Sequence, residues 1–234
     1  MHESYMILAI DTCGSSGSIA LGLKEGQDLY ILGNSQFGGR SYSERLVAAV
    51  GELLGLGGVH LGLIHALVAV NGPGSFTGVR VGLSAVKGLA EGSQIRVLAV
   101  SRLEVFAAAS GVSSVALGAH RQEVFLRLAE PASAARELLA GAAELAAIQP
   151  HPPRVAVCDE EAAQLLQAAW PAVELVRTAA PNADDALRLC APRVARGEFI
   201  DAALLDGHYL RRSDAEIFGA DVAAQAAAAA KQRA

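Results

Sequence analysis

One segment of the sequence constrains the fold more than any other: a buried strand, a glycine-rich turn and a largely apolar helix follow one another directly. The run 66–70 is continuously apolar, as expected of a strand that is covered on both faces. The turn Asn71-Gly72-Pro73-Gly74 cannot continue that strand, and a helix is expected from about residue 76 to residue 90. A strand that leads directly into a helix predicts parallel strands joined by crossover helices.

The rest of the first half continues this alternation, after three strands that lie close together in the sequence. Tight connections between those three strands favour antiparallel pairing. Ser41 and Glu44 have the spacing of a capping box that opens the next helix. The elements expected in this half are strands at 6–11, 18–23, 28–32, 66–70 and 96–100 and helices at 43–54, 76–90 and 102–109.

The second half restarts with two strands and then alternates again, which indicates a structural duplication into two lobes. Its expected elements are strands at 112–117, 123–128, 154–157 and 174–177 and helices at 134–147, 160–169 and 184–195. The expected division of the chain is an amino-terminal lobe at 1–105, a carboxyl-terminal lobe at 106–205, a segment at 206–222 that could return to the first lobe, and an Ala-rich tail at 223–234.

Charge and composition exclude several classes of function. Hydrophobic residues make up 52% of the chain, which is enough to build a sizeable core. The formal net charge is -5, so the chain lacks the basic excess that holds nucleic acid by its phosphates. No window approaches the roughly 18 uninterrupted apolar residues that span a bilayer. The three cysteines are too far apart for a zinc knuckle or a disulfide framework, which favours a reducing cytoplasm.

Two helices carry too little polar surface for helices that face water. In the helix at 76–90, the polar residues form one narrow stripe at i, i+4, i+7 and i+11, namely Arg80, Ser84, Lys87 and Glu91. The helix at 43–54 has a wide apolar stripe and small residues opposite it. Two readings remain open, a larger intramolecular core or helix–helix contact with a partner protein. The residues expected at a partner contact are Leu46, Val47, Val50, Leu53, Gly78, Val81, Gly82, Ala85 and Leu89.

Candidates for chemistry are few. Asp11 ends the first strand, where an Asp could hold a metal-bound phosphate or merely open a turn. None of the six histidines forms an i, i+3 or i, i+4 pair, so no two-His metal face is expected. Cys13 follows a strand, but no His lies near it in sequence, and a buried thiol is the simpler reading. The acidic run Asp159-Glu160-Glu161 disfavours phosphate binding at the start of its helix.

Five segments of the sequence closely resemble the TsaB/YeaZ family. They are residues 6–12, 41–46, 87–90, 209–211 and, above all, the string Gly72-Pro73-Gly74-Ser75-Phe76-Thr77-Gly78-Val79-Arg80-Val81-Gly82. The resemblance implies an α/β fold with two lobes, the actin-like, sugar kinase and Hsp70 ATPase (ASKHA) fold, with a mixed sheet and crossover helices in each lobe. It also implies the dimerisation subunit of the bacterial complex that makes threonylcarbamoyladenosine in tRNA.

The resemblance further implies that this chain has no catalytic residue and no metal site. The catalytic paralogue, TsaD, carries a metal-binding His-x-x-x-His, whereas the matching stretch here begins with Arg102 and ends with Phe106. Asp11 and Thr12 would be a vestige of a phosphate-binding site. No cofactor would be bound tightly, although ATP or ADP could lie at the partner interface. The implied partners are a TsaD-type catalytic subunit, a TsaE-type ATPase, a second copy of the chain, and tRNA only through the complex.

The sequence departs from the family pattern at four positions. Gly118 and His120 replace an Asp and an Arg in a hairpin, Gly207 replaces a Pro, and Cys158 replaces a Gly. The alternative reading is an independent enzyme, either a nucleotide-dependent kinase of the same superfamily or a glycoprotease-like peptidase. The kinase would need a glycine-rich phosphate loop, and the peptidase would need an activated nucleophile or a metal.

Overall fold

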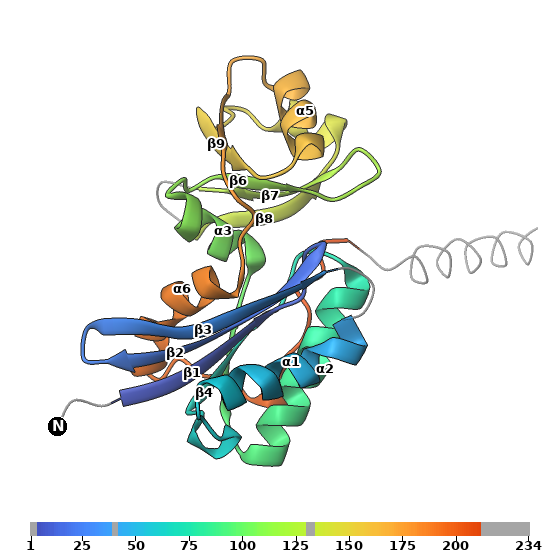
Figure 1. The fold of residues 1–234 in the computed structure, drawn as a ribbon. Helices are drawn as coiled ribbons and strands as arrows, with labels where there is room; N and C mark the ends of the chain where they lie inside the picture. The colour runs from blue at the N-terminus through green and yellow to red at the C-terminus, as the bar shows by residue number, and fades with distance from the viewer. Residues whose placement is uncertain (1–3, 39–41, 130–133, 212–234) are drawn as a thin grey trace, which may run out of the picture.

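A computed structural model describes residues 4–38, 42–129 and 134–211, and it shows two α/β lobes, one above the other in Figure 1. The expected capping box at Ser41, most of the segment 206–222 and the tail 223–234 lie outside the described residues. The two-lobed α/β fold with a mixed sheet in each lobe is confirmed. Within the described residues, no helix has the length and apolar character needed to cross a membrane.

The first lobe is built on a five-stranded sheet in the order β3-β2-β1-β4-β5. The pairs β1–β2 and β2–β3 are antiparallel, and the pairs β1–β4 and β4–β5 are parallel. Short connections therefore produce the antiparallel edge, and crossover helices produce the parallel one, as predicted. The strands are β1 (Ser4–Asp11), β2 (Ser16–Glu25), β3 (Asp28–Gly38), β4 (Ala66–Val70) and β5 (Arg96–Val100).

Helices cover both faces of this sheet. The first face carries α1 (Tyr42–Leu56) and α2 (Phe76–Ser93), and the other carries α6 (Ala183–Ala195). Two neighbouring residues of β2 show the arrangement, because successive side chains in a strand point to opposite faces. Leu21 lies beside the end of α1, whereas Gly22 is in close contact with Leu187 of α6.

The second lobe is a smaller sheet in the order β10-β9-β6-β7-β8, with β6–β7 and β7–β8 antiparallel. Its core includes Trp170, whose indole N–H donates to the carbonyl of Leu145 at 3.0 Å. The elements are β6 (Val115–Gly118), β7 (Val124–Leu128), β8 (Arg136–Ala140), α4 (Ala142–Ala147), β9 (Arg154–Val157), α5 (Glu160–Ala169) and β10 (Glu174–Arg177).

Helix α3 (Arg102–Ser110) joins the lobes and divides its apolar side chains between them. Val105 is part of the first-lobe core, whereas Leu103 and Phe106 pack with residues of β6 and β7. The remaining elements are two short 3-10 helices, η2 (Leu61–Leu63) and η3 (Ala202–Leu204).

Two expectations about the secondary structure and the division into lobes are wrong. The Ala-rich helix at 134–147 is instead the strand β8 and the short helix α4. Leu138 and Leu139 pair with Leu126 and Phe125 of β7, and this tertiary pairing overrides local helix propensity. The boundary at residue 205 is wrong as well, because Leu187 and the rest of the inner face of α6 belong to the first-lobe core.

Candidate functional site

The carboxyl end of β1 holds the two residues expected as a vestigial phosphate site, and the protein already satisfies both. Asp11 is 2% exposed; its Oδ1 accepts from the backbone N–H of Cys13 at 2.8 Å, and its Oδ2 lies 3.3 Å from Arg102 Nε. Burial alone would lower the pKa of Arg102, but the adjacent Asp11 carboxylate raises that pKa above its ordinary value. The Thr12 hydroxyl donates to the carbonyl of Gly78 at 2.7 Å.

The glycines of α2 face this same turn. A Cβ at Gly82 would lie 2.3 Å from the Thr12 hydroxyl oxygen, and a Cβ at Gly78 would lie 2.0 Å from the Thr12 carbonyl oxygen. Their lack of a side chain lets α2 approach β1 closely. The structure therefore corrects the expectation that Gly78 and Gly82 lie on a partner-facing surface, because the close neighbour lies inside the same lobe.

The outward face of α1 and α2 is narrower than the sequence indicated. Leu46, Val50 and Leu53 are nearly inaccessible and belong to the core of the lobe, so their placement at a partner contact is also corrected. The physical reason is that these three residues point at the sheet beneath α1. Val47 is 60% exposed. Val81, Ala85 and Leu89 are half-buried along α2, which packs beside α1. A partner contact through these last four residues stays a prediction.

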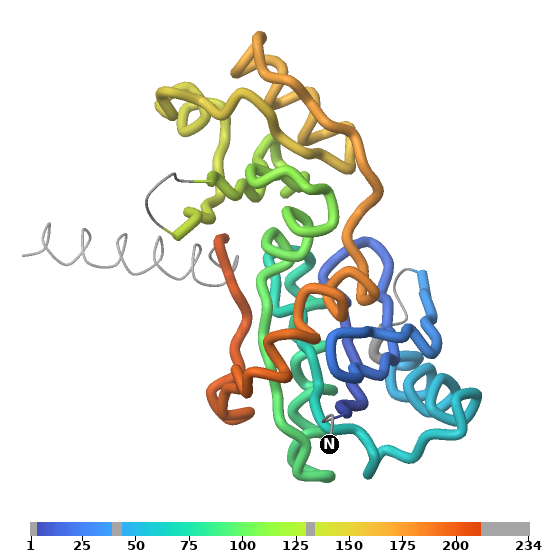
Figure 2. The backbone as a smooth tube through the Cα atoms, turned by 90° about the vertical axis from the view of Figure 1, so that its left-hand side faces the viewer, coloured from blue at the N-terminus to red at the C-terminus, as the bar shows by residue number. Residues whose placement is uncertain are grey.

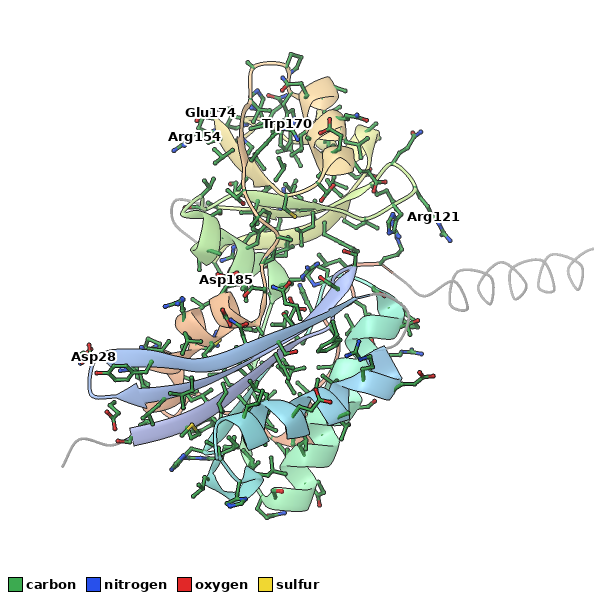
Figure 3. The ribbon with its side chains drawn as sticks, in the orientation of Figure 1. Asp28, Arg121, Arg154, Trp170, Glu174 and Asp185 are labelled. Carbon is green, nitrogen blue, oxygen red and sulfur yellow. The ribbon has the colours of Figure 1, made fainter. Side chains whose placement is uncertain are left out.

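A cavity of about 1130 Å³ lies between the lobes. From the first lobe it is lined by the turn at 13–15 and by the start of α2, including Phe76 and Arg80. From the second lobe it is lined by the β6–β7 turn and by Asp159. The carboxyl-terminal residues 208–211 form a further wall. Figure 3 labels Arg121 on the β6–β7 turn, which projects at the right-hand edge of the second lobe.

The second-lobe wall carries the carboxylate of Asp159. A nucleotide-hydrolysing fold would instead need backbone N–H groups there that are free to bind phosphate. Asp159 Oδ1 accepts from the N–H of Ala162 in the first turn of α5, and its Oδ2 accepts from the N–H of Gly118, both at 2.8 Å. The chain's own carboxylate therefore takes up these donors. A Cβ at Gly118 would lie 2.6 Å from Asp159 Oδ1, which explains why this position carries no side chain.

The β6–β7 turn has an unusual backbone. His120, Arg121 and Gln122 all have positive φ, between 57° and 60°, a conformation that L-residues adopt at a cost. The hydrogen bond from Ala119 N–H to the Glu123 carbonyl closes the turn, and Arg211 donates to the His120 carbonyl at 3.3 Å. One hydrogen bond within the turn and one from Arg211 therefore hold this strained backbone in place.

The thiols at the cavity are poor nucleophiles. Burial and the neighbouring Asp11 raise the pKa of Cys13 well above its ordinary value, and its thiol donates to the Val70 carbonyl at 3.2 Å. Burial and Asp159 raise the pKa of Cys158 to about 11. Nucleophilic attack requires the thiolate, which is scarce in both cases. Phe106 is fully buried, and the described part of the chain contains no cluster of three metal-ligating side chains.

A polar network across the lobes was not visible in the sequence. Glu137 of β8 accepts from the hydroxyl of Ser101 at 2.6 Å and from Arg127 at 2.7 Å, and its Oε2 lies 2.9 Å from His208 Nε2. Burial would raise the pKa of Glu137, but the donors His208, Ser101 and Arg127 hold it below its ordinary value. These residues are far apart along the chain, and no local motif connects them.

Comparison with known proteins identifies relatives for most of the chain. Residues 34–151 match the model of the family described as "TsaD: tRNA N6-adenosine threonylcarbamoyltransferase". The chain is 35% identical over 108 residues to the tRNA threonylcarbamoyladenosine biosynthesis protein TsaB of Haemophilus influenzae, covering 46% of this chain and 44% of that protein. It is 37% identical over 101 residues to Escherichia coli TsaB, covering 43% and 42%. The chain thus spans about half the length of the curated relatives it matches.

The structural likeness extends further than the sequence likeness. YeaZ from Pseudomonas aeruginosa matches 88% of this chain and 100% of its own, with a TM-score of 0.70 and 27% sequence identity. A crystal structure titled as an uncharacterized protein with similarity to peptidase YeaZ, from Pseudomonas aeruginosa, matches the same shares with a TM-score of 0.73 and 27% identity. The similarity therefore includes both lobes.

Proposed function

Because the chain belongs to the TsaB/YeaZ family, we propose that it serves tRNA threonylcarbamoyladenosine formation as a non-catalytic subunit that binds and supports a TsaD-type threonylcarbamoyltransferase. One observation carries the non-catalytic part of this proposal. Arg102 and Phe106 stand where the sequence resemblance places the two metal-binding histidines of the transferase. Arg102 is paired with Asp11, and Phe106 is fully buried, so both positions serve the packing of the lobes.

The partner contact in this proposal is the surface along α1 and α2. Val47 on α1 is exposed, and the half-buried Val81, Ala85 and Leu89 lie along α2. Covering the apolar side chains of such a strip with a second helix pair removes them from water and lowers the free energy of the complex. The same strip can pair with a second copy of the chain, so a homodimer and a complex with the transferase would compete for it.

The remaining members of the complex would be reached through the transferase. With a formal net charge of -5, the chain has little attraction of its own for tRNA. A TsaE-type ATPase would supply nucleotide hydrolysis, and ATP or ADP would be held at the partner interface and not tightly by this chain alone. The carboxylate of Asp159, which accepts from the N–H of Gly118 in β6 and from the N–H of Ala162 in α5, supports this division of labour. The cytoplasm is the compartment that fits.

The alternative functions find less support. A kinase of the same superfamily would need amides free to receive phosphate in the second lobe, and Asp159 occupies them. A thiol peptidase would need a thiolate, whereas burial raises the pKa of both cavity thiols.

Reconstitution with purified components tests the proposal. The TsaD-type and TsaE-type proteins of the same organism are incubated with threonylcarbamoyl donor and tRNA, with and without this chain, and the modified nucleoside is quantified by mass spectrometry. We expect modification to require both the transferase and this chain, and this chain alone to yield none. Modification by this chain without the transferase, or an unchanged rate when this chain is left out, would contradict the proposal.

A further inference from the structure

Residues 206–211 run from one lobe to the other along the interlobe cavity, and Figure 2 shows this segment in red leading from the first lobe towards the second. On the first lobe its attachment is mainly through the backbone. The N–H of His208 donates to the carbonyl of Asn71 at 2.7 Å, and the side-chain amide of Asn71 donates to the carbonyl of Asp206 at 3.2 Å. The ring of Tyr209 packs on Phe76 of α2, with 5.3 Å between ring centroids.

On the second lobe the attachment is through side chains. His208 Nε2 lies 2.9 Å from Glu137 Oε2, and the guanidinium of Arg211 forms an ion pair with Glu123. Leu210 packs against the apolar cluster that α3 shares with β6 and β7. The side chain of Glu137 is 9% exposed and that of His208 is 38% exposed, so the contact joins a buried carboxylate of β8 to a half-buried ring of the segment. The same six-residue segment is therefore fixed to both lobes.

Gly207 permits this path. The ring of Tyr209 lies against Gly207, where a Cβ would be 2.4 Å from the ring Cζ. A side chain at this position would force the ring of Tyr209 away from its place between Gly207 and Phe76.

We propose that residues 206–211 form a strap that holds the lobes in the closed arrangement, and that release of His208 and Arg211 from the second lobe opens the interlobe cavity. Besides the strap, the chain crosses between the lobes at α3 and at the link between β10 and α6. Those two crossings can act as hinges, whereas residues 208–211 of the strap form one wall of the cavity. This inference does not depend on the partner or the reaction proposed above.

The three native cysteines provide a test that separates opening from unfolding. Cys158 lines the cavity and is only partly buried, whereas Cys13 and Cys190 are both buried in the first-lobe core. The full chain and the double variant His208→Ala/Arg211→Ala are treated with iodoacetamide at one pH, and the alkylation rate of each cysteine is mapped by mass spectrometry. We expect Cys158 to react about tenfold faster in the variant, because the contacts to Glu137 and Glu123 are lost, with Cys13 and Cys190 unchanged within about twofold.

Arg177→Ala is the matched control, because it removes an ion pair with Glu160 that lies wholly within the second lobe. Its cysteines should react at the rates of the unchanged chain. Equal acceleration of all three cysteines in the double variant would mean general unfolding and would overturn the proposal, as would an unchanged rate at Cys158. The single variant Arg211→Ala, which leaves the buried Glu137 contact in place, repeats the measurement if the double variant does not fold, and the same outcomes apply to it.

Discussion

At the scale of single residues, three of the four glycines in the segment 72–82 are explained by one close approach. Gly74, Gly78 and Gly82 all lie against the turn that follows β1, and a Cβ at Gly74 would be 2.2 Å from the carbonyl oxygen of Cys13. Residues 72–82, which carry the strongest resemblance to the family, therefore pack the start of α2 against the end of β1. These three glycines are needed for folding, whatever partner the lobe binds.

Gly82→Ala and Gly88→Ala should have opposite effects on stability. Both positions lie in α2, but an added Cβ at Gly82 meets the Thr12 hydroxyl, whereas nothing lies within 4 Å of a Cβ at Gly88. We expect Gly82→Ala to lower the free energy of unfolding by about 1–3 kcal/mol through overpacking. Gly88→Ala should raise it by up to about 1 kcal/mol through helix propensity. Urea unfolding followed by circular dichroism measures both, and equal effects would refute the packing described for Gly82.

Glu137→Gln should destabilise the chain in a pH-dependent way. The pKa of Glu137 is lowered in the folded chain, so its carboxylate contributes stability that is present above its unfolded pKa and is lost as the pH falls through the folded value. At pH 7 we expect a loss of about 1–3 kcal/mol, which is typical of hydrogen bonds to a charged group. The difference from the unchanged chain should shrink below about pH 4.

The control for this measurement is Glu174→Gln, which breaks the exposed ion pair between Glu174 and Arg154 and should cause no measurable loss. Unfolding free energies are compared at pH 7 and below pH 4. A Glu137→Gln deficit that is the same at both pH values would show that the carboxylate charge is not the source of the stability.

At the scale of helices and strands, the sequence predicted most elements but not their neighbours. β4, β5, β9 and β10 have the predicted bounds, because each is a short stretch of β-branched and other apolar residues, flanked by a charged residue in β5, β9 and β10. The helix predicted at 134–147 was wrong because a high alanine content indicates only local helix propensity, whereas β8 forms by pairing with β7. The outward face of α1 could not be settled either, since Leu46 and Val47 are equally apolar and only the packed sheet distinguishes them.

Charges placed on three helical positions should separate partner binding from folding. Ala85→Glu puts a charge on the half-buried strip and should weaken association with the TsaD-type partner at least tenfold while the chain stays folded. Ser84→Glu, on the exposed polar stripe next to it, is the matched control and should leave binding nearly unchanged. Val50→Glu should instead unfold the chain, because Val50 is buried in the core. Sedimentation with the partner and thermal melting distinguish these results, and full binding by folded Ala85→Glu would exclude the strip as the interface.

At the scale of the whole molecule, the two lobes have different tasks in this account. The first lobe presents α1 and α2, and the second lobe is attached to it by α3, by the link to α6 and by the strap 206–211. The acidic side chains at the carboxyl ends of β1 and β9 are used internally, because Asp11 pairs with Arg102 and Asp159 accepts from the N–H groups of Gly118 and Ala162. The sequence indicated the missing phosphate loop, but it could not indicate that His208 returns to Glu137, because the two residues meet only in the folded chain.

The central claim, that this chain is a subunit whose α1–α2 surface binds a TsaD-type transferase, is tested most directly by site-specific photo-crosslinking in the host. A benzophenone amino acid replaces Val47, on the exposed side of α1, or Gln164, on the exposed side of α5 in the second lobe. Irradiation followed by mass spectrometry identifies what each position touches. We predict a crosslink from position 47 to the TsaD-type subunit and none from position 164. Crosslinks to that subunit only from position 164, or from neither position while the complex still co-purifies, would contradict the account.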